Sequence, residues 1–436
     1  MEKLVKKMKN FSAKAGDLVE ISTDNEVFSG TLIPSVNHDI LVLKLDSGYN
    51  LGIKKNKIKK FRLIKKFSQE RPEKQNIVHN KNLPTISILH TGGTLASRVS
   101  YETGAVSARF TPEELLAMFP GLKEIANFRN KLVREMFSDD LRFKHFSILA
   151  REIEREIKNK VHGIIIGMGT DNLAVAASAL SFVLESCPVP VILVGSQRSS
   201  DRGSSDAYLN LLSASLFITK TDFSGVAICM HENLNDKTCL ILPACKTRKL
   251  HTSRRDAFKV VNDKPIARIN YEMNQIEFLK KNYGKRNGRL AIKDKFEEKV
   301  GLIKITINMN AKQFLSYKGY KGLIIEGTGL GHTPLDVIDK ETKEHAKIKK
   351  VLQVLSKNTV LVMTSQCLFG RVNMNVYSKG RELQELGVIS GKDMLPETAF
   401  VKLSWLLGNY PKQVKELIGK NLRGEINENL TKEFLE

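Results

Sequence analysis

Residues 85–94, TISILHTGGT, decide the fold of this chain. An apolar run that leads into two glycines is typical of a buried strand ending in a tight turn. A second such run, residues 164–167, leads into Gly169-Thr170-Asp171. Ligands bind beyond the carboxyl ends of the strands in open parallel sheets, so we expect Thr91 and Thr170 to lie at one binding edge.

The pattern around this stretch alternates between strands and helices from residue 84 onward. A capping box at Thr111-Pro112-Glu113-Glu114 predicts a further helix start. Such alternation predicts an α/β fold, with a parallel sheet covered by helices on both faces. The expected strands are 85–90, 163–167, 189–195, 225–230, 300–307, 322–326 and 359–364, with a hairpin at 268–278. The expected helices are 143–160, 173–184, 206–219, 341–355, 398–407 and 412–418.

Short strands with turns between them precede this region and predict a small β-barrel. The expected strands are 16–21, 27–33, 40–45 and 50–53, and residues 54–66 then carry eight Lys or Arg. Residues 1–83 hold 17 Lys or Arg against 9 Asp or Glu, a net of +8. We therefore expect a barrel at 1–68, a linker at 69–83, an α/β domain with the active site at 84–285 and a smaller α/β domain at 286–436.

Composition narrows the class of protein. The 436 residues are 42% hydrophobic and 27% charged, and no apolar run approaches the roughly 20 residues of a membrane helix. No signal peptide is apparent, so we expect a cytoplasmic protein with no membrane contact. The five cysteines are scattered, which favours buried, reduced thiols over disulfides or a zinc site. The net charge of +22 fits either a polyanionic partner or solvated surface lysines.

The residues at the expected strand ends have the chemistry of a hydroxyl nucleophile. A threonine hydroxyl is weakly nucleophilic at neutral pH and requires a base, for which Lys249 is a candidate. Asp171 can hold an ammonium group, and Gly92-Gly93 can present backbone N–H groups. Each short motif alone is more often a structural turn.

The ordered set of motifs is more specific. Residues 91–96 (TGGTLA) and 169–171 (GTD) resemble the two signatures of L-asparaginases and related glutaminases. Residues 194–206, 249–258, 327–332 and 364–373, together with the N-terminal barrel, resemble the D-type subunits of archaeal glutamyl-tRNA(Gln) amidotransferases. The resemblance covers most of residues 15–66 and 84–410.

This resemblance implies roles for particular residues. Thr91 would attack the side-chain amide, with Thr170, Asp171 and Lys249 as the accompanying Thr-Asp-Lys set. Which threonine forms the covalent bond stays open. The residues implied to bind substrate are Tyr101 on a mobile flap, Ser138 at the substrate carboxylate and Gly169 of the second signature.

The second signature departs from the family pattern at two positions, Met168 and Asn172. The family usually has histidine and threonine there. The loss of the histidine puts the electrostatics and rate of the site in doubt, although neutral packing by Met168 is the favoured interpretation.

The resemblance also implies partners. Glutamine would be the substrate, and ammonia would pass to the E-type subunit of the amidotransferase, which activates Glu-tRNA(Gln) with ATP and Mg. This chain would bind no cofactor or metal itself, and it would form a homodimer within a heterotetramer. The alternatives are a free L-asparaginase and, more distantly, a non-catalytic RNA-binding scaffold.

Overall fold

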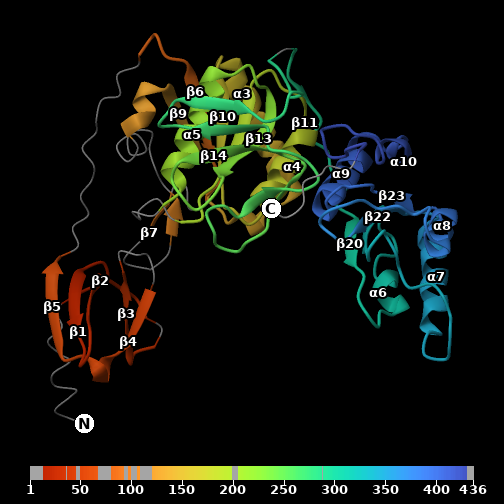
Figure 1. Cartoon of the computed structure of the whole chain (residues 1–436), viewed down its shortest axis with the longest axis horizontal. Coiled ribbons are helices and arrows are strands. Elements are labelled where there is room, and N and C mark those ends of the chain that lie inside the picture. Colours follow the sequence, from red (N-terminus) through yellow and green to blue (C-terminus); the bar gives the residue numbers. More distant parts are fainter. Residues whose placement is uncertain are drawn as a thin grey trace.

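A computed structural model describes residues 13–35, 37–45, 50–66, 80–92, 97–99, 106–108, 120–198, 205–286 and 288–429. Along the chain they form an antiparallel barrel, a large mixed sheet with helices and a small parallel sheet with helices (Figure 1). The helix expected at Thr111 and the flap residue Tyr101 lie outside these residues. The structure has the α/β fold preceded by an N-terminal β-structure that the sequence predicts.

The barrel is a five-stranded antiparallel sheet in the order β4-β3-β2-β1-β5. Side chains alternate between its interior and solvent, and Val19, Ile21, Leu41, Leu43 and Ile53 form the centre of its core. The outermost strands β4 and β5 do not pair with each other among the described residues, so the barrel is not fully closed by hydrogen bonds. Its strands are β1 (Leu18–Ser22), β2 (Val27–Ile33), β3 (Ile40–Lys44), β4 (Asn50–Lys54) and β5 (Lys60–Lys65), with a 3-10 turn η1 (Lys55–Lys57).

The large sheet has the order β18-β17-β14-β13-β12-β10-β6-β9. The five strands from β13 to β9 are parallel, whereas β14, β17 and β18 each pair with their neighbours in antiparallel fashion. The parallel sheet expected here is therefore mixed, because a short loop instead of a helical crossover joins β13 to β14. The strands are β6 (Thr85–His90), β9 (Asn127–Leu132), β10 (Gly163–Gly167), β12 (Pro190–Val194), β13 (Gly225–His231), β14 (Thr238–Pro243), β17 (Ala267–Asn270) and β18 (Gln275–Phe278).

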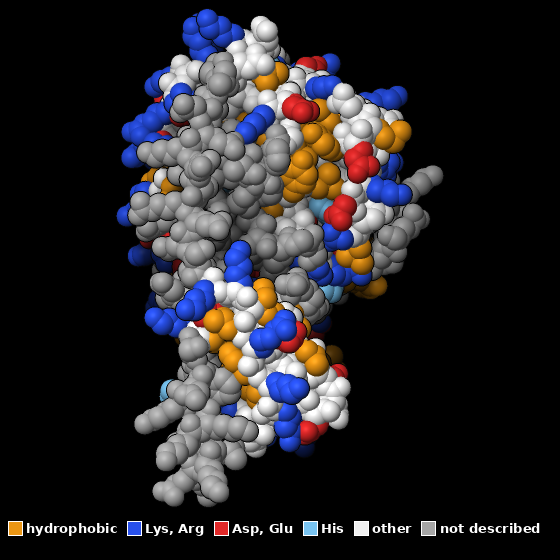
Figure 2. All heavy atoms as spheres, turned by 90° about the vertical axis from the view of Figure 1, so that its left-hand side faces the viewer, with side chains coloured by type: hydrophobic (Ala, Val, Ile, Leu, Met, Phe, Trp, Pro, Cys, Tyr) orange, Lys and Arg blue, Asp and Glu red, His pale blue; other side chains and the backbone are white. Residues whose placement is uncertain are grey.

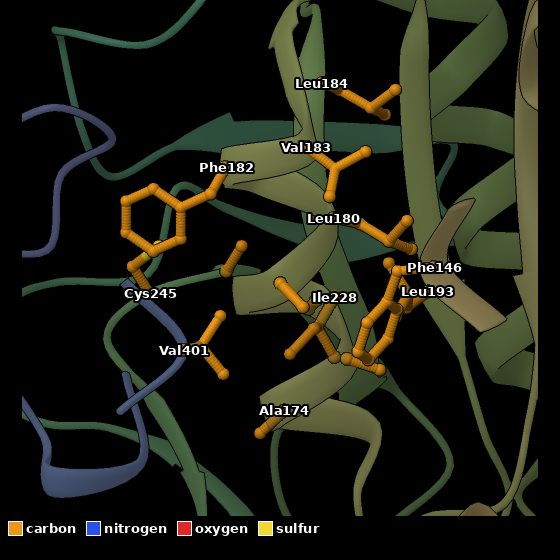
Figure 3. Close-up of a cluster of buried hydrophobic side chains, with 14 of the residues drawn as sticks. Phe146, Ala174, Leu180, Phe182, Val183, Leu184, Leu193, Ile228, Cys245 and Val401 are labelled. Carbon is orange, nitrogen blue, oxygen red and sulfur yellow. The ribbon is translucent and has the colours of Figure 1, made fainter. Parts of the chain in front are cut away.

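Helices cover both faces of this sheet. The helices α3 (Phe143–Lys158) and α4 (Leu173–Val183) pack on one face, and α5 (Ala207–Lys220) packs on the other. Helix α4 is apolar on nearly all sides, which is typical of a helix buried between two layers. In Figure 3, Leu180, Leu193 and Phe146 lie on one side of it and Phe182, Cys245 and Val401 on the other.

The small parallel sheet has the order β20-β21-β22-β23. Its helix α9 also packs on α4, so one hydrophobic core joins both α/β units. The Phe182 and Trp405 rings lie 5.5 Å apart in this core. The elements are β20 (Val300–Lys304), α6 (Ala311–Leu315), β21 (Gly322–Gly327), α7 (Glu344–Leu355), β22 (Val360–Ser365), α8 (Ser378–Glu385), β23 (Ile389–Ser390), α9 (Pro396–Asn409) and α10 (Val414–Leu417).

Minor elements complete the described structure. They are the hairpin β7 (Ser97–Val99) and β8 (Val106–Ala108), the pair β15 (Thr247–Lys249) and β16 (Phe258–Val260), the pair β11 (Leu184–Ser186) and β19 (Ala291–Ile292), and the 3-10 turns η3 (Pro120–Glu124) and η4 (Ser138–Asp140). None of the helices in the described ranges combines the length and apolar character needed to cross a bilayer. All five thiols are free, but Cys367 is exposed, so the expectation that every cysteine is buried is wrong at that position.

Candidate active site

The site forms where the adjacent parallel strands β6 and β10 end. His90 is paired with Gly167, so the residues that follow the two strands emerge at the same edge of the sheet. Gly92 has a φ of +107°, and a side chain there would place its Cβ 2.3 Å from the carbonyl oxygen of Met136. Glycine is therefore required for the chain to turn closely beside Met136.

A cleft of about 600 Å³ opens at this edge. Five of the predicted site residues line it: Ser138, Gly169, Thr170, Asp171 and Lys249. The other lining residues are Gly92, Glu135, Met136, Phe137, Asp139, Asp140, Ser196, Gln197 and Thr252. The cleft volume is within the range of small-molecule sites.

Lys249 connects the two predicted site residues of the second signature. Its Nζ donates to Thr170 Oγ1 at 2.9 Å and to Asp171 Oδ1 at 2.8 Å. The Lys249 side chain is 13% exposed and the Asp171 side chain 71% exposed, so the amine lies inside the cleft with the carboxylate at its mouth. A hydroxyl within hydrogen-bond reach of an amine is the arrangement that proton transfer to or from a threonine requires.

Thr91 lies beside this cleft but does not line it. The residue is buried, its backbone N–H donates to the Gly167 carbonyl at 2.9 Å, and its Oγ1 is directed to the same carbonyl at 3.4 Å. The predicted role of Thr91 as the attacking hydroxyl stays a prediction. Thr94, the second threonine of the same signature, lies outside the described residues, as does Tyr101.

Asn172 is a site residue whose role the sequence did not reveal. Its backbone N–H donates to Ser138 Oγ and its side-chain amide donates to the Ser138 carbonyl, each at 3.1 Å. Gly169 packs against the same serine, since a Cβ at that glycine would lie 3.1 Å from Ser138 Oγ. Asn172 therefore fixes Ser138 against the second signature. The only sequence signal was its departure from the family pattern.

Met168 is fully buried and belongs to the core between the sheet and α4. Its side chain does not line the cleft. The structure thus supports neutral packing for this departure from the family pattern.

A second loop closes one side of the cleft. Ser196 and Gln197 follow β12, and the buried carboxylate of Asp206 holds them. Asp206 Oδ1 accepts from Ser196 Oγ at 2.9 Å and from the backbone N–H groups of Gln197 and Arg198 at 3.0 Å each. The sequence indicated this segment only as part of a motif, because the carboxylate and the loop meet only after folding.

Charge in the cleft is mostly negative. Among the described lining residues, Glu135, Asp139, Asp140 and Asp171 carry carboxylates and Lys249 carries an amine. A substrate with an ammonium group suits this arrangement. No group of three His, Cys, Asp or Glu side chains suited to a metal ion occurs in the described ranges.

The fold and cleft define an amidohydrolase of the asparaginase type. Residues 85–283 match the family "Asparaginase, N-terminal" and residues 299–418 match "Glutaminase/Asparaginase C-terminal domain". The L-asparaginase of Thermococcus kodakarensis has a similar structure, with a TM-score of 0.70 and 26% identity over 79% of this chain and 100% of that one. L-asparaginase I of Vibrio cholerae gives a TM-score of 0.67 and 26% identity over 79% of this chain and 99% of its own.

Residues 13–64 match the family "GatD N-terminal domain". The D-type subunit of glutamyl-tRNA(Gln) amidotransferase from Methanococcus maripaludis strain C7 is 46% identical over 96% of this chain and 99% of its own. Its counterpart from Pyrococcus furiosus is 44% identical over 96% of each chain. The chain belongs to this family, the D-type subunits of glutamyl-tRNA(Gln) amidotransferase.

Proposed function

We propose that this chain hydrolyses glutamine to supply ammonia for the conversion of Glu-tRNA(Gln) to Gln-tRNA(Gln). Family membership supports the overall reaction. The observation that carries the chemistry is the position of Lys249 Nζ, 2.9 Å from the Thr170 hydroxyl and 2.8 Å from Asp171 within one cleft.

The proposed reaction proceeds through an acyl-threonine. A threonine oxygen forms a bond to the carboxamide carbon, and its proton passes through the Thr170–Lys249 pair to the leaving nitrogen. The carbon–nitrogen bond then breaks and ammonia leaves. Water adds to the ester, its proton returns to the threonine oxygen, and glutamate is released. Asp171 would bind the substrate ammonium and Ser138 its carboxylate.

The attacking residue follows from access to the cleft. The Thr91 hydroxyl is directed to the Gly167 carbonyl, and Thr91 does not line the cleft. If the attacking hydroxyl belongs to the first signature, this geometry favours Thr94 over Thr91. Thr91 then serves to join the ends of β6 and β10 through its backbone bond to Gly167.

The proposed assembly includes the E-type partner of the amidotransferase. That partner would bind ATP and Mg and activate Glu-tRNA(Gln), while this chain binds no cofactor. A homodimer of this chain within a heterotetramer, located in the cytoplasm, completes the proposal. The names of the relatives support the complex.

An assay of the reconstituted complex tests this function. The chain, its partner, ATP, Mg and Glu-tRNA(Gln) should yield Gln-tRNA(Gln) from glutamine. Thr170→Val should abolish amidation with glutamine but not amidation with added ammonium salt, because the partner then receives ammonia directly. Absence of Gln-tRNA(Gln) with the unmodified chain would refute the proposal.

The second candidate is a free L-asparaginase, which the similarity to the two solved asparaginases favours. Turnover of asparagine and glutamine by the chain alone and with its partner separates the two functions. Faster asparagine than glutamine turnover, unaffected by the partner, would establish the asparaginase.

A further inference from the structure

Gln197 places an unused hydrogen-bond donor beside the cleft. Its side-chain Nε2 is buried, and no acceptor lies within hydrogen-bond distance among the described residues. The same residue lines the cleft. Leaving a buried donor unpaired costs about 1–3 kcal/mol, and few such groups occur in native structures. An acceptor supplied by a bound molecule would remove this cost.

The backbone of Gln197 is firmly anchored, and its side chain takes no part in the anchor. Its backbone N–H lies 3.0 Å from each carboxylate oxygen of Asp206. Asp206 is itself fully buried and also accepts from Asn210 Nδ2 at 3.2 Å. The side-chain amide therefore extends from a fixed point, and its Nε2 has no acceptor of its own in the described part of the chain.

The backbone that leads to Gln197 lies next to the reacting groups. A Cβ on Gly195 would lie 2.8 Å from Thr170 Cγ2, so the chain that leads to Gln197 packs against Thr170. The Thr170 hydroxyl is the one that Lys249 holds. An uncharged amide donor at this position suits the uncharged carbonyl oxygen of a carboxamide.

We propose that Gln197 donates a hydrogen bond to the side-chain carbonyl oxygen of glutamine and so helps to position the scissile amide. This inference rests on the proposed glutaminase function and adds a substrate-binding residue to it. Gln197 acts through binding and orientation, whereas proton transfer belongs to the Thr170–Lys249 pair.

Gln197→Met tests the inference, because methionine keeps the length of the side chain but has no donor. In the complex with the partner, kcat/KM for glutamine should fall about 10- to 100-fold, the effect of one lost hydrogen bond. The melting temperature should stay the same or rise, since the substitution removes a buried unpaired donor. Gln197→Glu, which replaces the donor with a second acceptor, should reduce kcat/KM further. Gln353→Met on the exposed side of α7 is the matched control and should change neither quantity.

Two results would overturn the role of Gln197. One is a kcat/KM within twofold of the unmodified chain for Gln197→Met. The other is a loss of activity that accompanies a lower melting temperature, which would assign Gln197 to the framework of the loop. If the unmodified chain does not hydrolyse glutamine, the proposed function fails separately. Calorimetric binding of L-glutamine to the unmodified chain and to Gln197→Met then still decides whether Gln197 contacts this ligand.

Discussion

Two lysines three positions apart show how burial assigns different roles to the same side chain. Lys246 is fully buried, and its Nζ lies 2.5 Å from Asp393 Oδ2 and 3.0 Å from the Asp393 carbonyl. Burial lowers the pKa of Lys246, and Asp393 opposes that shift. Lys249 instead lies in the cleft on Thr170 and Asp171. In the sequence the two lysines belong to one basic run, residues 246–249, and such a run is more often a solvated face.

Substituting each lysine by methionine should separate the two roles. Lys249→Met removes the amine that serves the threonine, so kcat for glutamine should fall about 10²- to 10⁴-fold while the melting temperature changes little. Lys246→Met leaves the buried carboxylate of Asp393 without its cation, with the Asn427 backbone N–H still donating to it, and should lower the free energy of unfolding by about 3–5 kcal/mol. Glutamine turnover and thermal unfolding of both variants provide the check. Full activity in Lys249→Met would remove this lysine from the mechanism.

At the scale of secondary-structure elements, sequence predicted the strands that are apolar and bounded by glycine. Strand β10 has the predicted bounds, because its isoleucines lie between two glycines. Strands β5 and β9 were missed, because as outer strands they carry many polar residues and lack the hydrophobic pattern. Strand β14 was not predicted either, because no glycine marks its ends, and the antiparallel pairing of β13 with β14 was missed with it.

In the candidate site, too, the residues that lie within a motif were predicted, and those whose contacts arise only from folding were not. The second signature and the motif at 249–258 indicated Thr170, Asp171 and Lys249, which the structure brings together in the cleft. The contributions of Asn172 and Asp206 were missed. Asn172 acts on Ser138, which is 34 positions away in the sequence, so its role arises only from folding. Asp206, at the N-terminus of α5, similarly accepts hydrogen bonds from the loop after β12, and this contact forms only on folding.

His90, the last residue of β6, should make the free energy of unfolding depend on pH. Burial lowers the pKa of His90 from 6.5 to about 4, against a smaller opposing effect from Asn130. Between these two pKa values His90 binds a proton in the unfolded chain but not in the folded chain. The contribution of neutral His90 to the free energy of unfolding is therefore complete above pH 6.5 and is lost as the pH falls toward 4. At pH 5 the loss amounts to about 2 kcal/mol. Thermal unfolding from pH 7.5 to 4.5 should show a smaller decrease for His90→Asn than for the unmodified chain. Parallel curves for the two proteins would contradict the assignment.

At the scale of the whole molecule, the hydrophobic cores separate the barrel from the two α/β units, whereas basic side chains are spread over both parts. The two α/β units share a core through α4 and α9, whereas the core of the barrel, as far as the structure describes the chain, contains only barrel residues. Lys and Arg side chains extend over the visible faces of the barrel and of the part above it (Figure 2). The barrel can therefore be removed without exposing the core that supports the cleft.

A chain that begins at Asn80 should keep its glutaminase activity, and its complex with the partner should bind Glu-tRNA(Gln) more weakly. This start retains the hydrogen bonds of Asn80 with the Asn127 side chain, at 2.9 and 2.8 Å, which fix the entry to β6. Glutamine turnover should stay within about twofold, because the cleft and the shared core are intact.

The deleted residues carry 16 Lys or Arg against 9 Asp or Glu, a net of +7. Their loss should raise the KM for Glu-tRNA(Gln) in the complex and make its dependence on salt concentration shallower, because fewer counterions are released from phosphates. An unchanged salt dependence would show that the lysines of the barrel are only solvated, and loss of glutamine turnover would show that the α/β units depend on the barrel for their fold.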